Sequence, residues 1–381
     1  MSPYNGAMAS LSDVLASTTR EGELWEPIDD RRIRCVACGH QCPLPDGALG
    51  VCKVRFNRGG RLHVPWGYVG GVQCDPIEKK PFFHAYPGAL AYSFGMLGCD
   101  LHCGYCQNWV TSQALRDPAA VPTPAPVSPD EIVEDALRLD ARLVVSTYNE
   151  PLITSEWAVE IFRVARDAGL QTAYVSNGNA TPRVIEYLRP WVDLYKVDLK
   201  SFDDRHYRQL GGRLEPILDT IRRLHALGVW LEIVTLLIRG FNDDDDEIER
   251  LTAFVASVSP DIPWHVTAFN ADYKMSARAD TSAAMLRRAA AIGQRNGLRF
   301  VYAGNRSGAV GALEHTHCPA CGEPVIERYA YHVRSYSLTV DGACPRCATR
   351  VPGRWDHRFG GQIADSPFLP GGRSSLRVLR S

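Results

Sequence analysis

Three cysteines close together in the chain constrain its fold more than any other feature. Cys99, Cys103 and Cys106 follow the pattern C-x3-C-x2-C inside the stretch GCDLHCGYCQNW, residues 98–109. Three thiolates on one short loop can hold three irons of a [4Fe–4S] cube, a cluster that otherwise takes four cysteines. The fourth iron is then free to bind a small molecule. The spacing therefore predicts a cluster with one open coordination position.

Eight further cysteines form two sets of four, which indicates additional metal sites. The chain has twelve cysteines, and only Cys74 stands alone. The two sets of four are Cys35, Cys38, Cys42 and Cys52, and Cys318, Cys321, Cys344 and Cys347. The first set combines short spacers with a Gly/Pro-rich connector. Four-thiolate zinc and a second Fe–S cluster both fit that pattern.

The second set has the spacing C-x2-C-x22-C-x2-C, which is typical of a structural zinc ribbon. Between its two halves, residues 329–340 predict a β-hairpin. Zinc binding to such a site supplies roughly 10 kcal/mol or more of folding free energy. A segment this short therefore needs no hydrophobic core of its own.

The composition predicts a cytoplasmic protein that acts on neither membranes nor nucleic acid. The N-terminal residues show no basic region followed by an apolar one, and no apolar run reaches the roughly 18 residues that span a bilayer. The formal net charge is −1, which gives no general attraction to nucleic acid. In a reducing compartment, clustered cysteines indicate metal ligands rather than disulfides.

Strand-like and helix-like segments alternate from residue 91 to residue 312. The expected strands are 91–98, 143–148, 171–176, 194–199, 229–238, 264–269 and 299–303, and the expected helices are 129–139, 155–168, 182–188, 244–257 and 281–296. Repeated strand–helix units predict an α/β fold with parallel strands and right-handed crossovers. In such folds the functional site lies at the C-terminal ends of the strands. The acidic run 243–246 is expected to be a solvated helix N-terminus.

Polar residues do gather where the expected strands end. The first strand delivers the cysteine loop, and the later strand ends carry Tyr148-Asn149-Glu150-Pro151, Ser176-Asn177, Asp198 and Lys200, Arg239 to Asn242, Asn270 and Asn305. His265 lies in the middle of its strand and could face either the core or the lumen. The predicted order is a flexible arm (1–30), a Cys-rich β module (31–90), a domain of parallel strands and helices (91–312), a zinc ribbon (313–356) and a tail (357–381).

These motifs together resemble the radical S-adenosylmethionine (SAM) superfamily and the enzymes related to pyruvate formate-lyase activating enzymes. The stretches 35–52, 75–81, 98–109, 148–151, 197–200, 272–275 and 301–305 resemble the AmmeMemoRadiSam system radical SAM enzyme. The resemblance covers about residues 30–355. It implies a partial (β/α)6 barrel of the TIM type with a small four-cysteine metal-binding module at each end.

The resemblance also implies a chemistry. A reduced cluster would cleave SAM to methionine and a 5′-deoxyadenosyl radical, which abstracts hydrogen from a substrate that the sequence does not identify. The residues expected to bind SAM are Tyr105, Asn108, Asn149, Glu150, Ser176, Asn177, Asp198 and Lys200. Glu150 suits the SAM amino group and Lys200 suits its carboxylate. Relatives commonly have His-Pro where this chain has Asn270-Ala271, so its handling of substrate is expected to differ.

The partners that the resemblance implies are an electron donor such as flavodoxin or ferredoxin, and Memo-like and AMMECR-like proteins of the same system. Two other functions remain open from the sequence. One is a glycyl-radical activase, whose substrate is a backbone glycine of another protein. The other is a non-catalytic Fe–S and zinc scaffold or electron carrier, which would need neither an open iron nor the strand-end polar residues.

Overall fold

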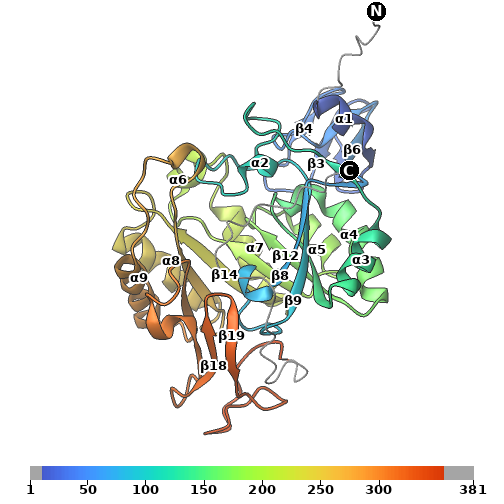
Figure 1. Cartoon of the computed structure of the whole chain (residues 1–381). Helices are drawn as coiled ribbons and strands as arrows, with labels where there is room; N and C mark the ends of the chain where they lie inside the picture. Colours follow the sequence, from blue (N-terminus) through green and yellow to red (C-terminus); the bar gives the residue numbers. More distant parts are fainter. Residues whose placement is uncertain (1–10, 356–381) are drawn as a thin grey trace, which may run out of the picture.

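The computed structural model describes residues 11–355, and one large open sheet organises them (Figure 1). The strand order is β16-β15-β14-β13-β12-β11-β9-β8. Seven of the strands are parallel to one another, whereas β8 pairs antiparallel with β9 at one edge. The strands are β8 Gly71–Pro76, β9 Leu90–Gly95, β11 Ala141–Ser146, β12 Gln171–Ser176, β13 Leu194–Asp198, β14 Trp230–Leu237, β15 Trp264–Ala268 and β16 Val301–Gly304. The α/β class is confirmed, and β16 adds a seventh parallel strand to the six that the resemblance implies.

Helices cover one face of this sheet. They are α3 Pro129–Arg138, α4 Ser155–Asp167, α5 Pro182–Leu188, α7 Glu215–Ala226, α8 Asp245–Val258 and α9 Ala283–Arg295, with the shorter α2 Trp109–Ser112, α6 Asp204–Gln209, η1 Ile77–Lys79, η2 Pro151–Thr154, η3 Tyr273–Met275 and η4 Gly311–Glu314. Each of the six longer helices packs against the next one along the chain. This continuous layer leaves the other face of the sheet free to form a site.

The strands alternate between the two faces, because successive side chains of a strand point in opposite directions. Val197 and Val266 belong to the hydrophobic core beneath the helices. Lys196 and Asp198, the neighbours of Val197 on β13, and Thr267 on β15 line a cavity on the opposite face. On β13 and β15, polar side chains therefore face the cavity.

Local signals explain where the helices begin. Ser128 and Glu131 form a reciprocal capping box at the start of α3, which satisfies two backbone N–H groups. Asp244 caps α8 by accepting hydrogen bonds from the N–H groups of Asp246 and Glu247. The acidic run is thus a helix N-terminus, as predicted.

The first described residues differ from the loose arm expected over 1–30. From Leu11 on, they form α1 Leu11–Ser17, β1 Thr19–Glu21 and β2 Trp25–Pro27. The strand β1 pairs with β6, and β2 pairs with β3. The remaining strands of this region are β3 Ile33–Cys35, β4 Pro43–Leu44, β5 Phe56–Arg58, β6 Arg61–Pro65, β7 Tyr68–Val69 and β10 Ala125–Pro126. Strands of three residues carry no periodicity, so pairing with later segments decides their structure.

The C-terminal module is a small antiparallel sheet at the other end of the molecule from the N-terminal strands (Figure 1). Its strands are β17 Thr316–His317, β18 Pro324–Tyr329 and β19 His332–Tyr336. The hairpin therefore lies earlier than the expected 329–340. Its turn contains Ala330 at φ +55°, and no Gly or Asn marks that position in the sequence. The predicted tail, 357–381, lies outside the described residues.

None of the described helices combines the length and the apolar character needed to cross a bilayer.

Candidate functional site

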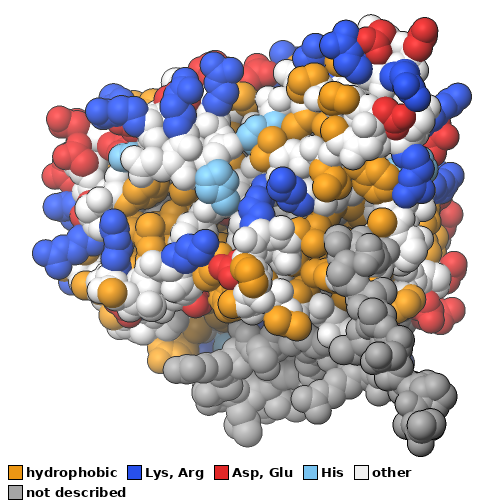
Figure 2. Space-filling model, turned by 90° about the horizontal axis from the view of Figure 1, so that it is seen from above, with side chains coloured by type: hydrophobic (Ala, Val, Ile, Leu, Met, Phe, Trp, Pro, Cys, Tyr) orange, Lys and Arg blue, Asp and Glu red, His pale blue; other side chains and the backbone are white. Residues whose placement is uncertain are grey.

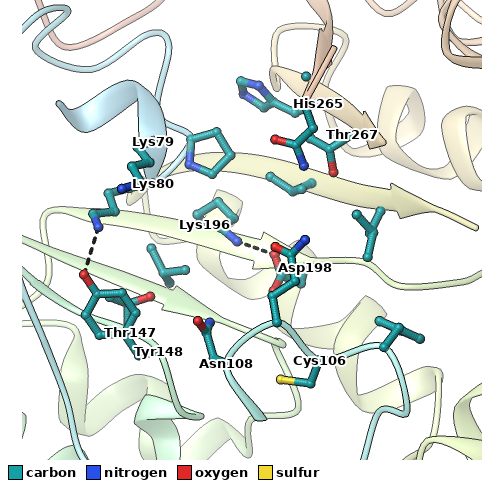
Figure 3. A pocket seen from close by; sticks show the side chains of 18 of the residues that line it. Lys79, Lys80, Cys106, Asn108, Thr147, Tyr148, Lys196, Asp198, His265 and Thr267 are labelled. Carbon is teal, nitrogen blue, oxygen red and sulfur yellow. Dashed lines mark hydrogen bonds and ion pairs between the residues drawn. The ribbon is translucent and has the colours of Figure 1, made fainter. Parts of the chain in front are cut away.

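A cavity of about 940 Å3 opens on the helix-free face of the sheet. Its lining includes all three cysteines of the loop that follows β9. The strand-end residues that line it are Tyr148, Asn149, Glu150, Asn177, Asp198, Lys200, Asn270 and Asn305. Figure 3 shows Cys106 and Asn108 on one side of this cavity and Lys79, Lys80 and His265 on other sides. The expected convergence of strand ends is therefore present.

Apolar side chains surround the cysteine loop. Cys103 is buried with Leu101, Tyr105, Leu210, Ile238 and Phe269, while Cys99 and Cys106 are half-buried against the same group. Burial raises the pKa of the Cys103 thiol to about 11. Thiols must lose their protons to ligate iron, and bound metal supplies the free energy for that loss. Three convergent thiols that open into a cavity fit a cluster with one open iron.

Asp100, beside the first cysteine, ties this loop to the end of β12. Its buried carboxylate accepts hydrogen bonds from Asn177 Nδ2 and Asn179 Nδ2, each at 2.7 Å. Its backbone oxygen lies 3.0 Å from Nε2 of His40, which comes from the N-terminal cysteine set. The role of Asp100 was not predicted, because a single acidic residue inside a metal-binding loop carries no sequence signal for contacts with another strand end.

Glu150 is held by donors of its own chain. Its carboxylate oxygens accept from Ser176 Oγ at 2.7 Å, from the N–H of Asn177 at 2.8 Å and from the N–H of Leu152 at 3.0 Å. Burial and the charge of Asp100 raise the pKa of Glu150 to about 8. Ser176 lies behind Glu150 and does not line the cavity. Its position is that of a residue that orients Glu150.

The residue before Glu150 secures the adjacent strand. Asn149 accepts a hydrogen bond from the N–H of Met96 at 3.0 Å, just after β9 ends.

Tyr105 packs its ring 6.0 Å from that of Phe241, and Asn108 precedes α2 at the cavity edge. Asn270 accepts from Arg306 at 2.5 Å. Arg306 therefore holds the Asn270 amide in place.

Asp198 lies between two lysines on the cavity side of β13. Lys196 Nζ contacts one of its carboxylate oxygens, and Lys200 Nζ lies 3.4 Å from the other. Burial lowers the pKa of Lys196. Burial acts in the same direction on Lys200, but the charges of Asp198 and Cys103 outweigh it and hold its pKa well above the usual value. Lys196 was missed because a single lysine within a predicted strand gives no signal by itself.

His265 faces the cavity and forms a buried pair with Glu232. His265 Nε2 lies 2.7 Å from Glu232 Oε2, and the same carboxylate accepts from the N–H groups of Phe83 and His84. Burial lowers the pKa of His265, while its hydrogen bond to Glu232 acts in the opposite direction. His265 stacks on Tyr302 with ring centroids 5.0 Å apart. The orientation of His265 could not be decided from the sequence, and Glu232 was not predicted as a site residue.

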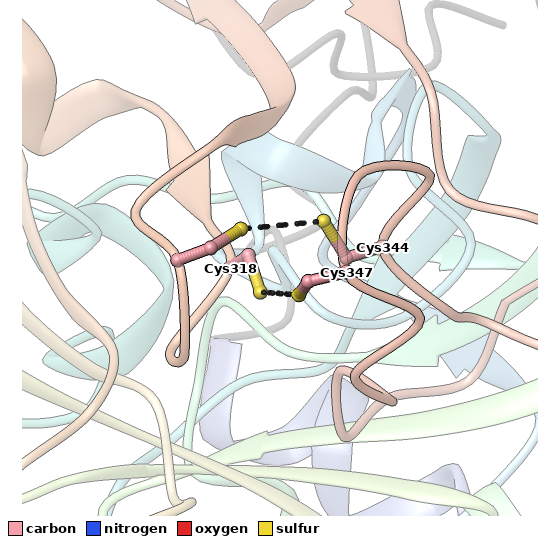
Figure 4. A group of neighbouring side chains, drawn as sticks. Cys318, Cys344 and Cys347 are labelled. Atoms are coloured by element: carbon pink, nitrogen blue, oxygen red, sulfur yellow. Dashed lines mark hydrogen bonds between the residues drawn. The ribbon is translucent and has the colours of Figure 1, made fainter.

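The C-terminal cysteines form a compact group (Figure 4). The ligand atoms of Cys318, Cys321, Cys344 and Cys347 all lie within 4.8 Å of one another, with Sγ–Sγ distances of 3.5 and 3.7 Å for two pairs. Four thiolates about 2.3 Å from one tetrahedral ion require this spacing. The group can therefore hold a single metal ion.

The N-terminal cysteines are less compact. Within residues 11–355, no second group of His, Cys, Asp or Glu side chains meets the same limit. Cys35 nevertheless lies close enough to contribute to the raised pKa values of Cys38, Cys42 and Cys52, which burial dominates. The set touches the site through Gly39, whose N–H donates to the carbonyl of Asn179 at 2.8 Å.

Known proteins are similar to the central part of this chain, and one of them is similar to most of its length. Residues 95–252 match the family described as Radical SAM superfamily. An uncharacterized protein of Methanocaldococcus jannaschii is 33% identical over 335 residues, which cover 87% of this chain and 98% of that protein. A pyruvate formate-lyase-activating enzyme of Staphylococcus aureus is 28% identical over 190 residues, which cover 45% of this chain and 71% of that enzyme.

Among solved structures, a domain of a pyruvate-formate lyase-activating enzyme from Bacteroides vulgatus is similar to this chain. It is 23% identical, covers 42% of this chain and 98% of its own, and has a TM-score of 0.38.

Proposed function

The chain belongs to the radical SAM superfamily, and we propose that it is an oxidoreductase that cleaves SAM reductively and acts on a small-molecule substrate. One observation carries the proposal most directly. Cys99, Cys103 and Cys106 converge at the edge of a cavity whose lining also includes residues at the ends of the parallel strands. A volume of about 940 Å3 lies at the upper end of the roughly 300–1,000 Å3 that small-ligand pockets occupy.

The three cysteines would hold the [4Fe–4S] cluster, and the strand-end residues would hold SAM. When bound, the cluster supplies the electron that splits SAM into methionine and a 5′-deoxyadenosyl radical, and a hydrogen atom is then taken from the substrate. Lys200 suits the SAM carboxylate, since Asp198 is shared with Lys196 and leaves positive charge in excess. Asn149, Glu150 and Asn177 offer oxygen acceptors for its amino group.

Other residues would shape the environment of the cluster and SAM. Tyr105 and Asn108 would contact the adenine, and Ser176 would orient Glu150. The apolar side chains around Cys103 limit the access of water to the reacting atoms. A one-electron donor such as flavodoxin or ferredoxin would reduce the cluster, and Memo-like and AMMECR-like proteins are further proposed partners.

The test is SAM cleavage by the full chain. Protein reconstituted without oxygen with iron and sulfide, then mixed with SAM and dithionite, is expected to release 5′-deoxyadenosine and methionine in equal amounts. Iron and sulfide analysis establishes that the cluster is present. A loaded protein that releases no 5′-deoxyadenosine would rule out the proposed activity and leave the electron-carrier alternative.

A second candidate is a glycyl-radical activase, and the similarity to the Staphylococcus aureus activating enzyme favours it. The two candidates differ in the substrate. An activase would transfer the radical to a backbone glycine of a partner protein, whereas the whole-chain relative and the two cysteine sets outside the central region are not explained by that activity.

We also propose that the C-terminal four-cysteine group binds zinc. Cys344→Ser is expected to lower the zinc content by one ion per chain and to lower the melting temperature, because removal of one of four ligands loses much of the binding free energy that folds the module. Cleavage of SAM should persist, since none of the four C-terminal cysteines lines the cavity that holds Cys103. Metal analysis and thermal unfolding measure both effects. Unchanged zinc in this variant would contradict the assignment.

A further inference from the structure

We infer that the substrate carries a carboxylate or phosphate group, which Lys79 and Lys80 bind at a subsite of the cavity separate from the cysteine loop. This inference rests on the proposed function, because it names the chemical class of the substrate of the same site.

Lysine is rare in this chain and concentrated in the cavity. Of 42 lysines and arginines, six are lysines and 36 are arginines. Four of the six lysines line the cavity, whereas no arginine within residues 11–355 does; they are Lys79, Lys80, Lys196 and Lys200. Figure 2 shows both basic and acidic side chains on the face that it presents.

Two of these lysines share one carboxylate. Lys79 Nζ lies 2.9 Å from Asp75 Oδ1, and Lys80 Nζ lies 3.1 Å from Asp75 Oδ2. Lys80 also donates to the hydroxyl of Tyr148 at 3.2 Å. The side chain of Lys80 is 5% exposed and that of Lys79 is 25% exposed. Two ammonium groups against one carboxylate leave an excess of one positive charge in a mostly buried place.

The neighbouring acidic residue does not remove this excess. Glu78 is on the same short helix η1, but its carboxylate lies 3.5 Å from Arg328, and both side chains are fully buried. Glu78 also accepts a hydrogen bond from the N–H of Gly88 at 3.0 Å. Glu78 is therefore paired with Arg328 and not with the two lysines. Because two ammonium groups share the single carboxylate of Asp75, an anion of the ligand is the natural partner for the remaining positive charge.

The same arrangement occurs a second time at the cysteine end. Lys196 and Lys200 share Asp198, and this pair lies with Cys106 on the side assigned to SAM. Figure 3 shows Lys79 at the end of η1, and Lys80 directly after it, apart from Lys196 and Asp198 on β13. Two separate sites of excess positive charge suit two anionic groups: the carboxylate of SAM and one group of the substrate. Lysine suits this role because its compact ammonium acts as a point charge toward either anion.

Equilibrium dialysis of the cluster-loaded full chain tests the inference. The probes are labelled malonate and labelled inorganic phosphate, added with saturating SAM and no reductant, so that SAM occupies its own subsite and is not consumed. At least one of the two anions is expected to bind with one site per chain. Neutral malonamide should not compete. Binding of malonate alone assigns a carboxylate, and binding of phosphate alone assigns a phosphate.

Substitutions locate the bound anion. Lys79→Gln is expected to weaken binding by about tenfold and the double variant K79Q/K80Q to abolish it, whereas K274Q is the matched control because Lys274 is 65% exposed and does not line the cavity. Lys79→Gln leaves Asp75 paired with Lys80, which protects the fold of that variant. Both variants should still release 5′-deoxyadenosine from SAM with dithionite, a readout that tests the proposed function separately. Failure of both anions to bind the natural chain, or equal binding to all variants, would overturn the inference.

Discussion

Cys103→Ala is expected to eliminate both the cluster and the cleavage of SAM. Cys103 is one of only three thiols on the loop after β9, so its loss leaves two ligands for the cluster. Changes in groups that merely support a metal ligand cost roughly 10–100-fold in affinity or activity. Removal of a ligand should therefore reduce 5′-deoxyadenosine formation by more than about 100-fold. Iron content, visible absorbance of the reconstituted protein and product release measure the effect.

Cys74 provides the matched control. It lies on β8, outside the three cysteine groups, and does not line the cavity. Cys74→Ala should retain the iron of the central cluster and the release of 5′-deoxyadenosine, because it removes one sulfur atom from a half-buried strand position. A C103A variant that retains cluster absorbance and cleaves SAM at the natural rate would show that these cysteines do not hold the cluster.

The regular part of the fold could be predicted because its signals are local. The helix expected over 182–188 is observed as Pro182–Leu188, with Thr181 as N-cap and proline in the first turn. The strand expected over 171–176 is observed as Gln171–Ser176. Apolar periodicity, capping residues and proline act within a few positions of the chain, and a sequence displays them directly.

Other features depend on partners far away in the chain. The structure of residues 11–27 comes from pairing with strands that follow later, and the turn at Ala330, which has no glycine, hides the true position of the C-terminal hairpin. Neither pattern has a local signal. Short strands and turns without glycine are therefore the places where the structure departs from expectation.

The candidate site divides in the same way. The cysteine loop and the strand-end residues were predictable, because parallel strands all end at one rim. Three further site residues were not predictable: Lys196, Glu232 and Asp100. Their roles depend on which side of a strand or loop they occupy and on which side chains contact them in the folded chain. The spacing of Lys196 and Asp198, two residues apart on one strand, was the only available clue to a shared face.

A buried ion pair fastens the N-terminal module to the sheet domain, and its disruption is the second large effect expected. Arg55 and Glu156 form two hydrogen bonds of 2.7 Å, and their side chains are 1% and 3% exposed. Arg55 also donates to the carbonyl of Ile153 at 3.0 Å and to Cys35 Sγ at 3.3 Å. The pair thus joins the first cysteine set to the segment that follows Glu150.

Glu156→Ala should lower the free energy of unfolding by about 3–5 kcal/mol, because it leaves the charge of Arg55 buried without a partner. At roughly 1.2 °C per kcal/mol for a chain of this size, the melting temperature should fall by about 4–6 °C. Glu160→Ala on the same helix is the matched control. It removes an exposed pair with Arg163, 3.3 Å apart, and should cost under about 1 kcal/mol.

The pH dependence and a double variant separate the charge effect from lost packing. Burial acts to raise the pKa of Glu156, but Arg55 outweighs it and holds the pKa below its usual value. The stabilisation is therefore present above the unfolded carboxyl pKa and is lost as pH falls through the folded pKa, so the natural chain and E156A should converge in acid. Replacing both residues with Met removes the charges together and should restore stability above that of E156A. Equal melting temperatures of E156A and E160A would show that the pair contributes no more than a surface contact.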